Sequence, residues 1–209
     1  MNTIKAIIFD AGEVFVLNSG QGVFEDMART CQLSLETVIK ATSRLIPAYQ
    51  RGDLNDETYW NEFQKETGLK VLPIDYIDLW SREFEKNVVI DQEVLGLIEG
   101  LTGRGYVIPV LSNTIPPHLK ALKSIDVFRP FEPKIFSCEV GCRKPEAEIY
   151  RLVLETISLC PEQAVFIDDS AEYVKAARNV GMHGIQYKDL LSLEKELKAV
   201  GVLIYTKMR

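Results

Sequence analysis

The sequence predicts an α/β protein with a parallel sheet covered by helices on both faces and a large helical insertion. Five short apolar segments have the length and composition of buried strands. Helical patterns separate the later segments, and strands that alternate with helices indicate βαβ units with parallel pairing. Only helical patterns fill the long stretch after the first strand. We therefore expect a Rossmann-like three-layer core with a parallel sheet, plus an inserted all-helical cap.

The first predicted strand covers residues 4–9 and ends abruptly at Asp10. Pro109 lies inside the second strand, and proline lacks a ladder donor, so we expect a bulge or an irregular start there. The later predicted strands cover residues 107–111, 134–136, 164–167 and 184–186.

Three helices are predicted, one before the second strand and two between later strands. Apolar residues at helical spacing cover 94–101, and Gly103 supplies a stop. Pro145 is expected at the start of the next helix, because proline suits the first helical position. Ser170 is expected to cap a third helix that ends before Gly181.

The domain boundaries follow from this pattern. Residues 1–17 and 89–209 are expected to form the catalytic core, and residues 18–88 the helical cap. Four aromatic residues of the cap follow helical spacing, which favours a role in its own core over a ligand-stacking surface. They are Trp60, Phe63, Trp80 and Phe84.

Composition excludes several classes of function. The 209 residues are 46% hydrophobic and carry a formal net charge of −6, so a broad basic surface for nucleic acid is not expected. No apolar run approaches the ~20 residues of a membrane span, and we expect no membrane partner. The four cysteines have no framework or zinc-site spacing, which favours reduced thiols in a cytoplasmic protein.

Polar groups follow the carboxyl ends of four predicted strands, the edge where open α/β sheets bind ligands. Three carboxylates among them would repel one another, and a magnesium ion with its preference for oxygen ligands would relieve this. A lysine and a hydroxyl group would complete a local site for an anion such as phosphate. The groups are Asp10, Ser112-Asn113-Thr114, Lys144 and Asp168-Asp169.

Four segments in this order resemble the motifs of the haloacid dehalogenase-like hydrolase superfamily. They are IIFDAGEV, VLSNT, GCRKPEAEIY and VFIDDSAEYVKAARNVGM. The likeness is strongest to the helical-cap phosphatase subgroup whose first motif reads Asp-x-Gly-x-Val, which includes a glucose-1-phosphate phosphatase. It covers essentially the whole chain, and it is more specific for superfamily than for substrate.

The resemblance implies a role for each of these positions. Asp10 corresponds to the nucleophile that forms an aspartyl-phosphate, and Lys144 to the lysine that stabilises it. Ser112, with Asn113 beside it, corresponds to the group that binds the transferring phosphoryl. The implied magnesium site comprises Asp10, the Gly12 carbonyl, Asp169 as a direct ligand, and Asp168 acting through water or Lys144.

Gly12 departs from the pattern of many phosphatases in this superfamily, which have a second aspartate there. Glycine keeps the backbone carbonyl but cannot protonate the leaving oxygen, and such assistance is typically worth about 10²–10⁴ in rate. A substrate with a good leaving group, such as an anomeric phosphate, would suffer least. Glu13 is adjacent, but a neighbouring side chain usually points elsewhere.

The function expected is that of a magnesium-dependent phosphatase that hydrolyses a small phosphorylated metabolite, such as a sugar phosphate, through an aspartyl-phosphate on Asp10. The alternatives are a 2-haloacid dehalogenase, a catalytically weak regulatory or binding member of the same fold, and a phosphotransferase. The oligomeric state stays open.

Other candidate residues are assigned non-catalytic roles. His118, near Pro116-Pro117, and His183 are expected in loops or at the surface. For Arg44, Tyr49 and Arg51 a solvated face of the cap is favoured over contact with substrate.

Overall fold

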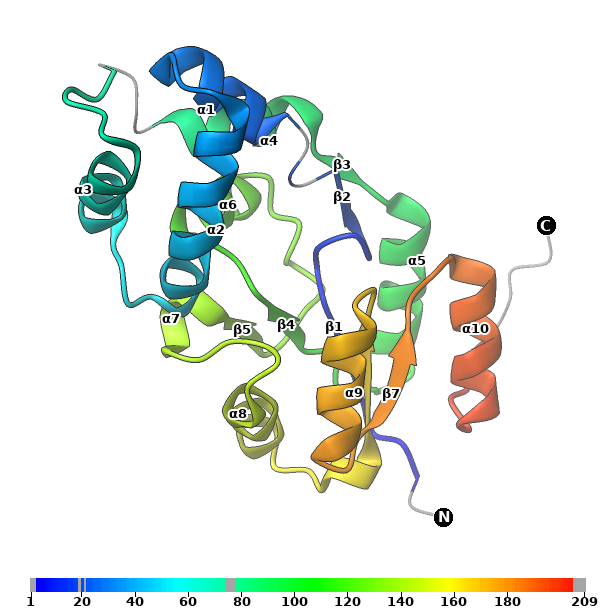
Figure 1. The fold of residues 1–209 in the computed structure, drawn as a ribbon. Coiled ribbons are helices and arrows are strands. Elements are labelled where there is room, and N and C mark those ends of the chain that lie inside the picture. The colour runs from blue at the N-terminus through cyan, green and yellow to red at the C-terminus, as the bar shows by residue number, and fades with distance from the viewer. Residues whose placement is uncertain (1–2, 19, 21, 74–77, 205–209) are drawn as a thin grey trace.

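A five-stranded parallel sheet forms the centre of the protein (Figure 1). The computed structural model describes residues 3–18, 20, 22–73 and 78–204. The strand order is β5-β4-β1-β6-β7, which confirms the predicted α/β class. The strands are β1 (Ala6–Phe9), β4 (Val110–Ser112), β5 (Lys134–Phe136), β6 (Ala164–Asp168) and β7 (His183–Gln186).

Helices cover both faces of this sheet and make three layers (Figure 1). Successive side chains of a strand point to opposite faces. In β1, Ile7 and Phe9 therefore join the core on one face, while Ala6 and Ile8 join the core on the other. The first face is covered by α5 (Gln92–Thr102), α6 (Pro116–Ser124) and α10 (Leu190–Ala199), and the second by α8 (Ala147–Ile157) and α9 (Ala171–Asn179). Two short elements, α7 (Ser137–Val140) and the 3₁₀ turn Pro161–Gln163, complete the core.

Between β1 and α5, the described part of the chain forms four helices that bury an apolar cluster. We call these four the insertion helices. A small antiparallel pair, β2 (Val16–Leu17) and β3 (Val89–Ile90), lies where the chain leaves and re-enters the core. The boundaries at residues 17 and 89 stay a prediction. The helices are α1 (Val23–Cys31), α2 (Leu35–Arg51), α3 (Asp56–Thr67) and α4 (Leu79–Asn87).

Among the predicted boundaries that differ from the structure, two have a clear physical reason. Regular pairing in β4 begins only at Val110, because Pro109 interrupts the ladder; Val107 makes just an isolated bridge with Ala6. The expected irregular start is thereby confirmed. Helix α8 begins at Ala147 instead of Pro145, because Glu146 still has extended backbone angles (φ −62°, ψ 133°).

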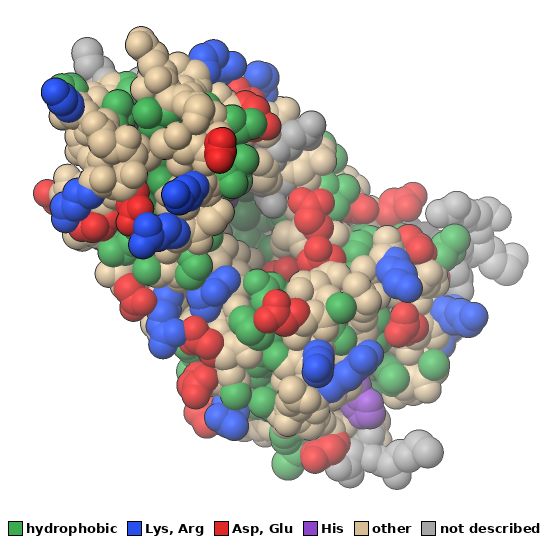
Figure 2. Space-filling model, viewed as in Figure 1, with side chains coloured by type: hydrophobic (Ala, Val, Ile, Leu, Met, Phe, Trp, Pro, Cys, Tyr) green, Lys and Arg blue, Asp and Glu red, His purple; other side chains and the backbone are tan. Residues whose placement is uncertain are grey.

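All four cysteines are free thiols: Cys31 is buried, Cys138 and Cys142 are half-buried, and Cys160 is exposed. Within the described ranges, the structure contains no helix long and apolar enough to cross a membrane. On the face seen in Figure 2, acidic and basic side chains are interspersed.

Gly52 marks a close contact between the insertion helices and the core. It ends α2 with a positive φ of 83°, and an added Cβ would lie 2.6 Å from the backbone oxygen of Cys138. Gly68 ends α3 with a similar φ of 73°, but nothing lies within 4 Å of its added Cβ. Substitutions at these two glycines therefore distinguish the cost of backbone strain from the cost of a steric clash.

We expect Gly52→Ala to destabilise the protein by more than Gly68→Ala. The left-handed conformation alone costs a non-glycine residue about 1–2 kcal/mol, and only Gly52→Ala adds a clash with backbone. Chemical denaturation of both variants measures the difference. Equal losses of unfolding free energy would show that the backbone around Gly52 accommodates the added methyl group without cost.

Candidate active site

The sheet topology brings three of the predicted residues to one edge. Asp10 directly follows β1, and its backbone N–H donates to the Ile167 carbonyl at 2.8 Å. Ser112 and Asp168 are the last residues of β4 and β6, which pair with β1 on either side. All three side chains are buried. The carboxyl ends of the three central strands therefore form a polar floor.

Lys144 joins two of the carboxylates. Its ammonium nitrogen lies 2.8 Å from Asp10 Oδ1 and 2.6 Å from Asp168 Oδ2, and the lysine itself is fully buried. Asp168 Oδ1 also accepts a hydrogen bond from the Ser170 backbone N–H at 2.8 Å. A buried lysine needs such partners, because an unpaired charge in the interior is costly.

Asn113 holds the Lys144 backbone in place. Its amide nitrogen donates to the Lys144 carbonyl at 2.9 Å, and its amide oxygen accepts from the Lys144 N–H, also at 2.9 Å. Both ends of the Asn113 side chain are therefore engaged with the lysine loop. The side chain was predicted to lie beside the phosphoryl group; in the structure it positions Lys144.

The carboxylate cluster fits a hard divalent cation. Asp10, Asp168 and Asp169 each offer an oxygen, and these oxygens lie within 4.8 Å of one another. Asp10 Oδ1 is buried and has no hydrogen bond of acceptable geometry, although it faces the lysine charge. Oxygen-only donors with spare capacity are those that magnesium takes in proteins.

Burial and mutual repulsion raise the pKa values of these acids. Desolvation, opposed by the Lys144 charge and reinforced by Asp168, raises the pKa of Asp10 to about 6. Desolvation also raises the pKa of Asp168, as well as that of Asp169, where the Asp10 charge adds to it. Burial acts to lower the pKa of Lys144, but the two adjacent carboxylates outweigh it, so this pKa is raised. Lys144 therefore stays charged, and its single positive charge must offset the negative charges of several neighbouring carboxylates.

Gly12 and Glu13 lie next to this cluster but differ in placement. Gly12 borders the cavity above Asp10, and a Cβ at this position would meet nothing within 4 Å. Glu13 is exposed and is not among the residues that line the cavity. Space for a larger side chain therefore exists at position 12.

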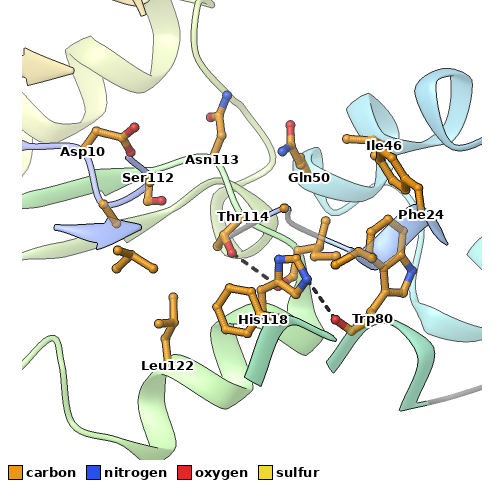
Figure 3. A pocket seen from close by; sticks show the side chains of 17 residues that line it. Asp10, Phe24, Ile46, Gln50, Trp80, Ser112, Asn113, Thr114, His118 and Leu122 are labelled. Atoms are coloured by element: carbon orange, nitrogen blue, oxygen red, sulfur yellow. Dashed lines mark hydrogen bonds between the residues drawn. The ribbon is translucent and has the colours of Figure 1, made fainter. Parts of the chain in front are cut away.

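A cavity of about 240 Å³ opens over Asp10 and Ser112 and runs toward the insertion helices (Figure 3). The polar floor forms one end. Residues from α1, α2, α4 and α6 form the other end, including Phe24, Ile46, Trp80 and His118. These side chains were not predicted as site residues, because helical spacing alone does not reveal which face meets a cleft.

His118 corrects the expectation of a loop or surface role. Pro116 occupies the first turn of α6, a favoured position for proline, so His118 belongs to that helix. Its ring stacks on Phe84 at 4.2 Å between centroids, and its Nε2 lies 3.1 Å from the Trp80 carbonyl oxygen. The double proline was the sequence signal that could have located this helix.

The aromatic residues of the insertion have two roles. Trp60 and Phe63 lie in the insertion's own core, as predicted. Trp80 lies in the same core, as predicted, whereas Phe84 packs into the core on one face of the sheet; both also line the cavity.

The three side chains that were assigned to a solvated face have specific partners. Tyr49 is fully buried and its hydroxyl donates to Asp56, so a solvated position was wrong for it. Arg44 is paired with Glu66 at 2.8 Å. Arg51 forms an ion pair with Glu146 of the core, two residues after Lys144. His183, the other histidine, is exposed at the start of β7.

A family model for haloacid dehalogenase-like hydrolases matches residues 4–181. The chain belongs to this family. The match spans both the strand-end carboxylates and the insertion helices. It confirms at family level the likeness carried by the four sequence motifs, and it establishes the chain as an enzyme of the hydrolase class.

Individual relatives have phosphatase and dehalogenase names. The sesquiterpene phosphatase astK of Aspergillus oryzae is 28% identical over 94% of this chain and 96% of its own length. A variant of the family enzyme bt-2542 of Bacteroides thetaiotaomicron, crystallised with magnesium and inorganic phosphate, is 25% identical with a TM-score of 0.75 over 88% of this chain and 94% of that one.

An L-2-haloacid dehalogenase of Xanthobacter autotrophicus has a TM-score of 0.63 and 19% identity over 97% of this chain and 85% of that one, a likeness of fold. Several other curated relatives are longer proteins, of which the chain spans 36% or less.

We expect His118 to make stability depend on pH. Burial lowers its pKa from the ordinary 6.5 to about 4, with its bond to Trp80 opposing this shift. The unfolded chain therefore binds a proton at higher pH than the folded one. The contribution of the neutral, buried imidazole to the free energy of unfolding is complete above about pH 6.5. It declines by about 3 kcal/mol in total as the pH falls toward 4.

Denaturation of wild type and His118→Gln at several pH values measures this effect. The variant should show a shallower decline in unfolding free energy over that window, and His183→Gln controls for the loss of a histidine. Parallel curves for wild type and His118→Gln would contradict a neutral buried imidazole.

Proposed function

We propose that the enzyme is a magnesium-dependent phosphatase that hydrolyses a small phosphomonoester through an aspartyl-phosphate on Asp10. The observation that carries this proposal is the fully buried Lys144 held between Asp10 and Asp168, beside Asp169. Three acids around one cation suit a site that receives a further cation and an anionic group.

In the first step, a carboxylate oxygen of Asp10 attacks phosphorus while the bond from phosphorus to the leaving oxygen breaks. The leaving alkoxide takes a proton from solvent and departs as the alcohol. In the second step, a water oxygen attacks phosphorus and gives a proton to solvent, the bond from phosphorus to Asp10 breaks, and Asp10 leaves as the free carboxylate while phosphate is released. The covalent route divides one difficult displacement into two easier ones.

Lys144 and Ser112 supply the electrostatic environment in both steps. The ammonium group at 2.8 Å keeps Asp10 ionised and offsets charge on the phosphoryl oxygens. The Ser112 hydroxyl, which borders the cavity beside Asp10, is placed to donate to a phosphoryl oxygen (Figure 3). Asn113 acts through Lys144, because both ends of its amide bind the lysine backbone.

Magnesium would be held by Asp10, Asp169 and the Gly12 carbonyl, with Asp168 acting through water or Lys144. When bound, the ion supplies positive charge to the phosphoryl oxygens and orients the phosphate. The Bacteroides enzyme, which was crystallised with magnesium and phosphate, and the fungal phosphatase support this choice.

The rival activities differ in what they demand of these residues. A 2-haloacid dehalogenase also uses an aspartate nucleophile but needs no metal, and dehalogenases of the family usually lack the Asp168-Asp169 pair. A weak regulatory or binding member is supported only by the missing acid at Gly12. A phosphotransferase would pass the phosphoryl group to an alcohol, which that missing acid also disfavours. The acid cluster favours the phosphatase.

Asp10→Asn should abolish phosphate release, by at least roughly 10³-fold, because an amide oxygen is a poor nucleophile. Chelation of magnesium should stop wild-type turnover as well. Phosphate release and circular dichroism measure activity and folding, and Asp126→Asn at an exposed turn is the matched control. Turnover that survives in Asp10→Asn, or an unchanged rate in chelator, would exclude the proposed chemistry.

Gly12→Asp should restore acid assistance, since nothing lies within 4 Å of the added Cβ. We expect the rate to rise by up to about 10²–10⁴ for alkyl phosphates, and less for 4-nitrophenyl phosphate, whose leaving group needs little help. Gly20→Asp, also in an open position on the cavity wall, controls for an added charge. A uniform loss over all substrates would mean that glycine is needed for access or backbone shape.

A further inference from the structure

The cavity changes in character along its length. At the floor, Asp10 and Ser112 offer charge and hydrogen bonds (Figure 3). The far wall is apolar and comes from both the insertion helices and α6. Its members from these helices are Val23, Phe24, Ile46, Trp80, Phe84 and Leu122. The group attached to the phosphate must lie against this wall.

Several polar atoms in the cavity are committed to partners within the protein. His118 uses Nε2 for the Trp80 carbonyl, at 3.1 Å. Gln50 Oε1 accepts from Arg143 at 3.0 Å, and both ends of Asn113 bind Lys144. The buried Trp80 Nε1 has no partner, but in Figure 3 it lies on the side of the indole ring away from Asp10. Few groups remain to bind the several hydroxyls of a sugar, and an unpaired hydroxyl is costly to bury.

Charge is equally scarce on the cavity wall. Among the described residues that line it, Asp10 is the only acid and no lysine or arginine occurs. A leaving group with its own phosphate or carboxylate would find no cation there. The wall therefore suits an uncharged group.

We propose that the leaving group of the substrate is a compact, uncharged hydrocarbon, such as an aromatic group, in place of a sugar. This inference rests on the proposed phosphatase function and narrows its substrate class. The size is consistent: a cavity of roughly 150 Å³ accepts benzene, and about 240 Å³ must hold both phosphate and its substituent. The sugar phosphate expected from the sequence resemblance is the competing outcome.

The test is a homologous series of methyl, ethyl, propyl and butyl phosphate, assayed with magnesium. The basicity of the leaving oxygen is nearly constant along this series, so differences in kcat/KM report the burial of the alkyl chain. One buried methylene is worth about 0.8 kcal/mol, or about fourfold in kcat/KM. Butyl phosphate should therefore exceed methyl phosphate roughly 60-fold. Glucose 6-phosphate, also the ester of a primary alcohol, should fall below butyl phosphate; a flat series, or faster glucose 6-phosphate, would overturn the proposal.

A matched pair of variants tests whether the apolar cavity wall causes the dependence of kcat/KM on chain length. Ile46 lines the cavity from α2, whereas Ile39 on the same helix is 41% exposed and outside it. Ile46→Gln should lower kcat/KM for butyl phosphate about tenfold and leave methyl phosphate nearly unchanged. Ile39→Gln should change neither. An equal loss for both substrates in Ile46→Gln would contradict contact with the alkyl chain.

Alkylphosphonates separate this inference from the proposed function. These compounds have no ester bond to hydrolyse, and calorimetry measures their affinity in the presence of magnesium. Affinity that rises about fourfold per methylene supports the apolar subsite, even if no ester is hydrolysed. An absence of ester hydrolysis would count against the proposed phosphatase activity but not against the subsite. Affinity independent of chain length would overturn the subsite whatever the activity.

Discussion

The buried ammonium group of Lys144 is the constraint on which the site depends. It lies in the interior only because Asp10 and Asp168 approach it to 2.8 and 2.6 Å from the ends of two neighbouring strands. Removing one partner of a buried ion pair commonly costs 3–5 kcal/mol. The backbone at residues 113 and 170 must also hold its place, since Asn113 fixes the lysine loop and the Ser170 N–H fixes Asp168. Strand pairing, loop geometry and charge are thus mutually dependent.

In the proposed phosphatase, chemistry and substrate choice have different structural origins. The strand ends supply the acids, the lysine and the hydroxyl, while the insertion helices and α6 supply the apolar wall. Two polar contacts connect these parts next to the lysine: Arg51 pairs with Glu146, and Gln50 accepts from Arg143. A substitution in α2 can therefore alter the substituent pocket without touching the carboxylates. The same carboxylate arrangement can serve different leaving groups when the helical wall differs.

Sequence reasoning succeeded where a local signal was strong. An apolar strand that ends in an acid identified Asp10 and Asp168, and strands alternating with helices indicated parallel pairing. It failed where tertiary packing decided the outcome. Glu146 keeps extended backbone angles, so α8 begins after it, at Ala147. His118 looked like a loop residue, yet it packs between Phe84 and the Trp80 carbonyl.

The sequence by itself determined the family, the sheet and the residues that meet at its edge. These follow from hydrophobic period and from polar residues at strand ends, which are properties of short segments. Only the tertiary structure decided that Asn113 serves the lysine, that Gly12 faces open space, and that Trp80 and Phe84 border the cavity. The physical reason is that a helix's apolar residues look alike whether they meet another helix or a substrate, and only packing distinguishes the two.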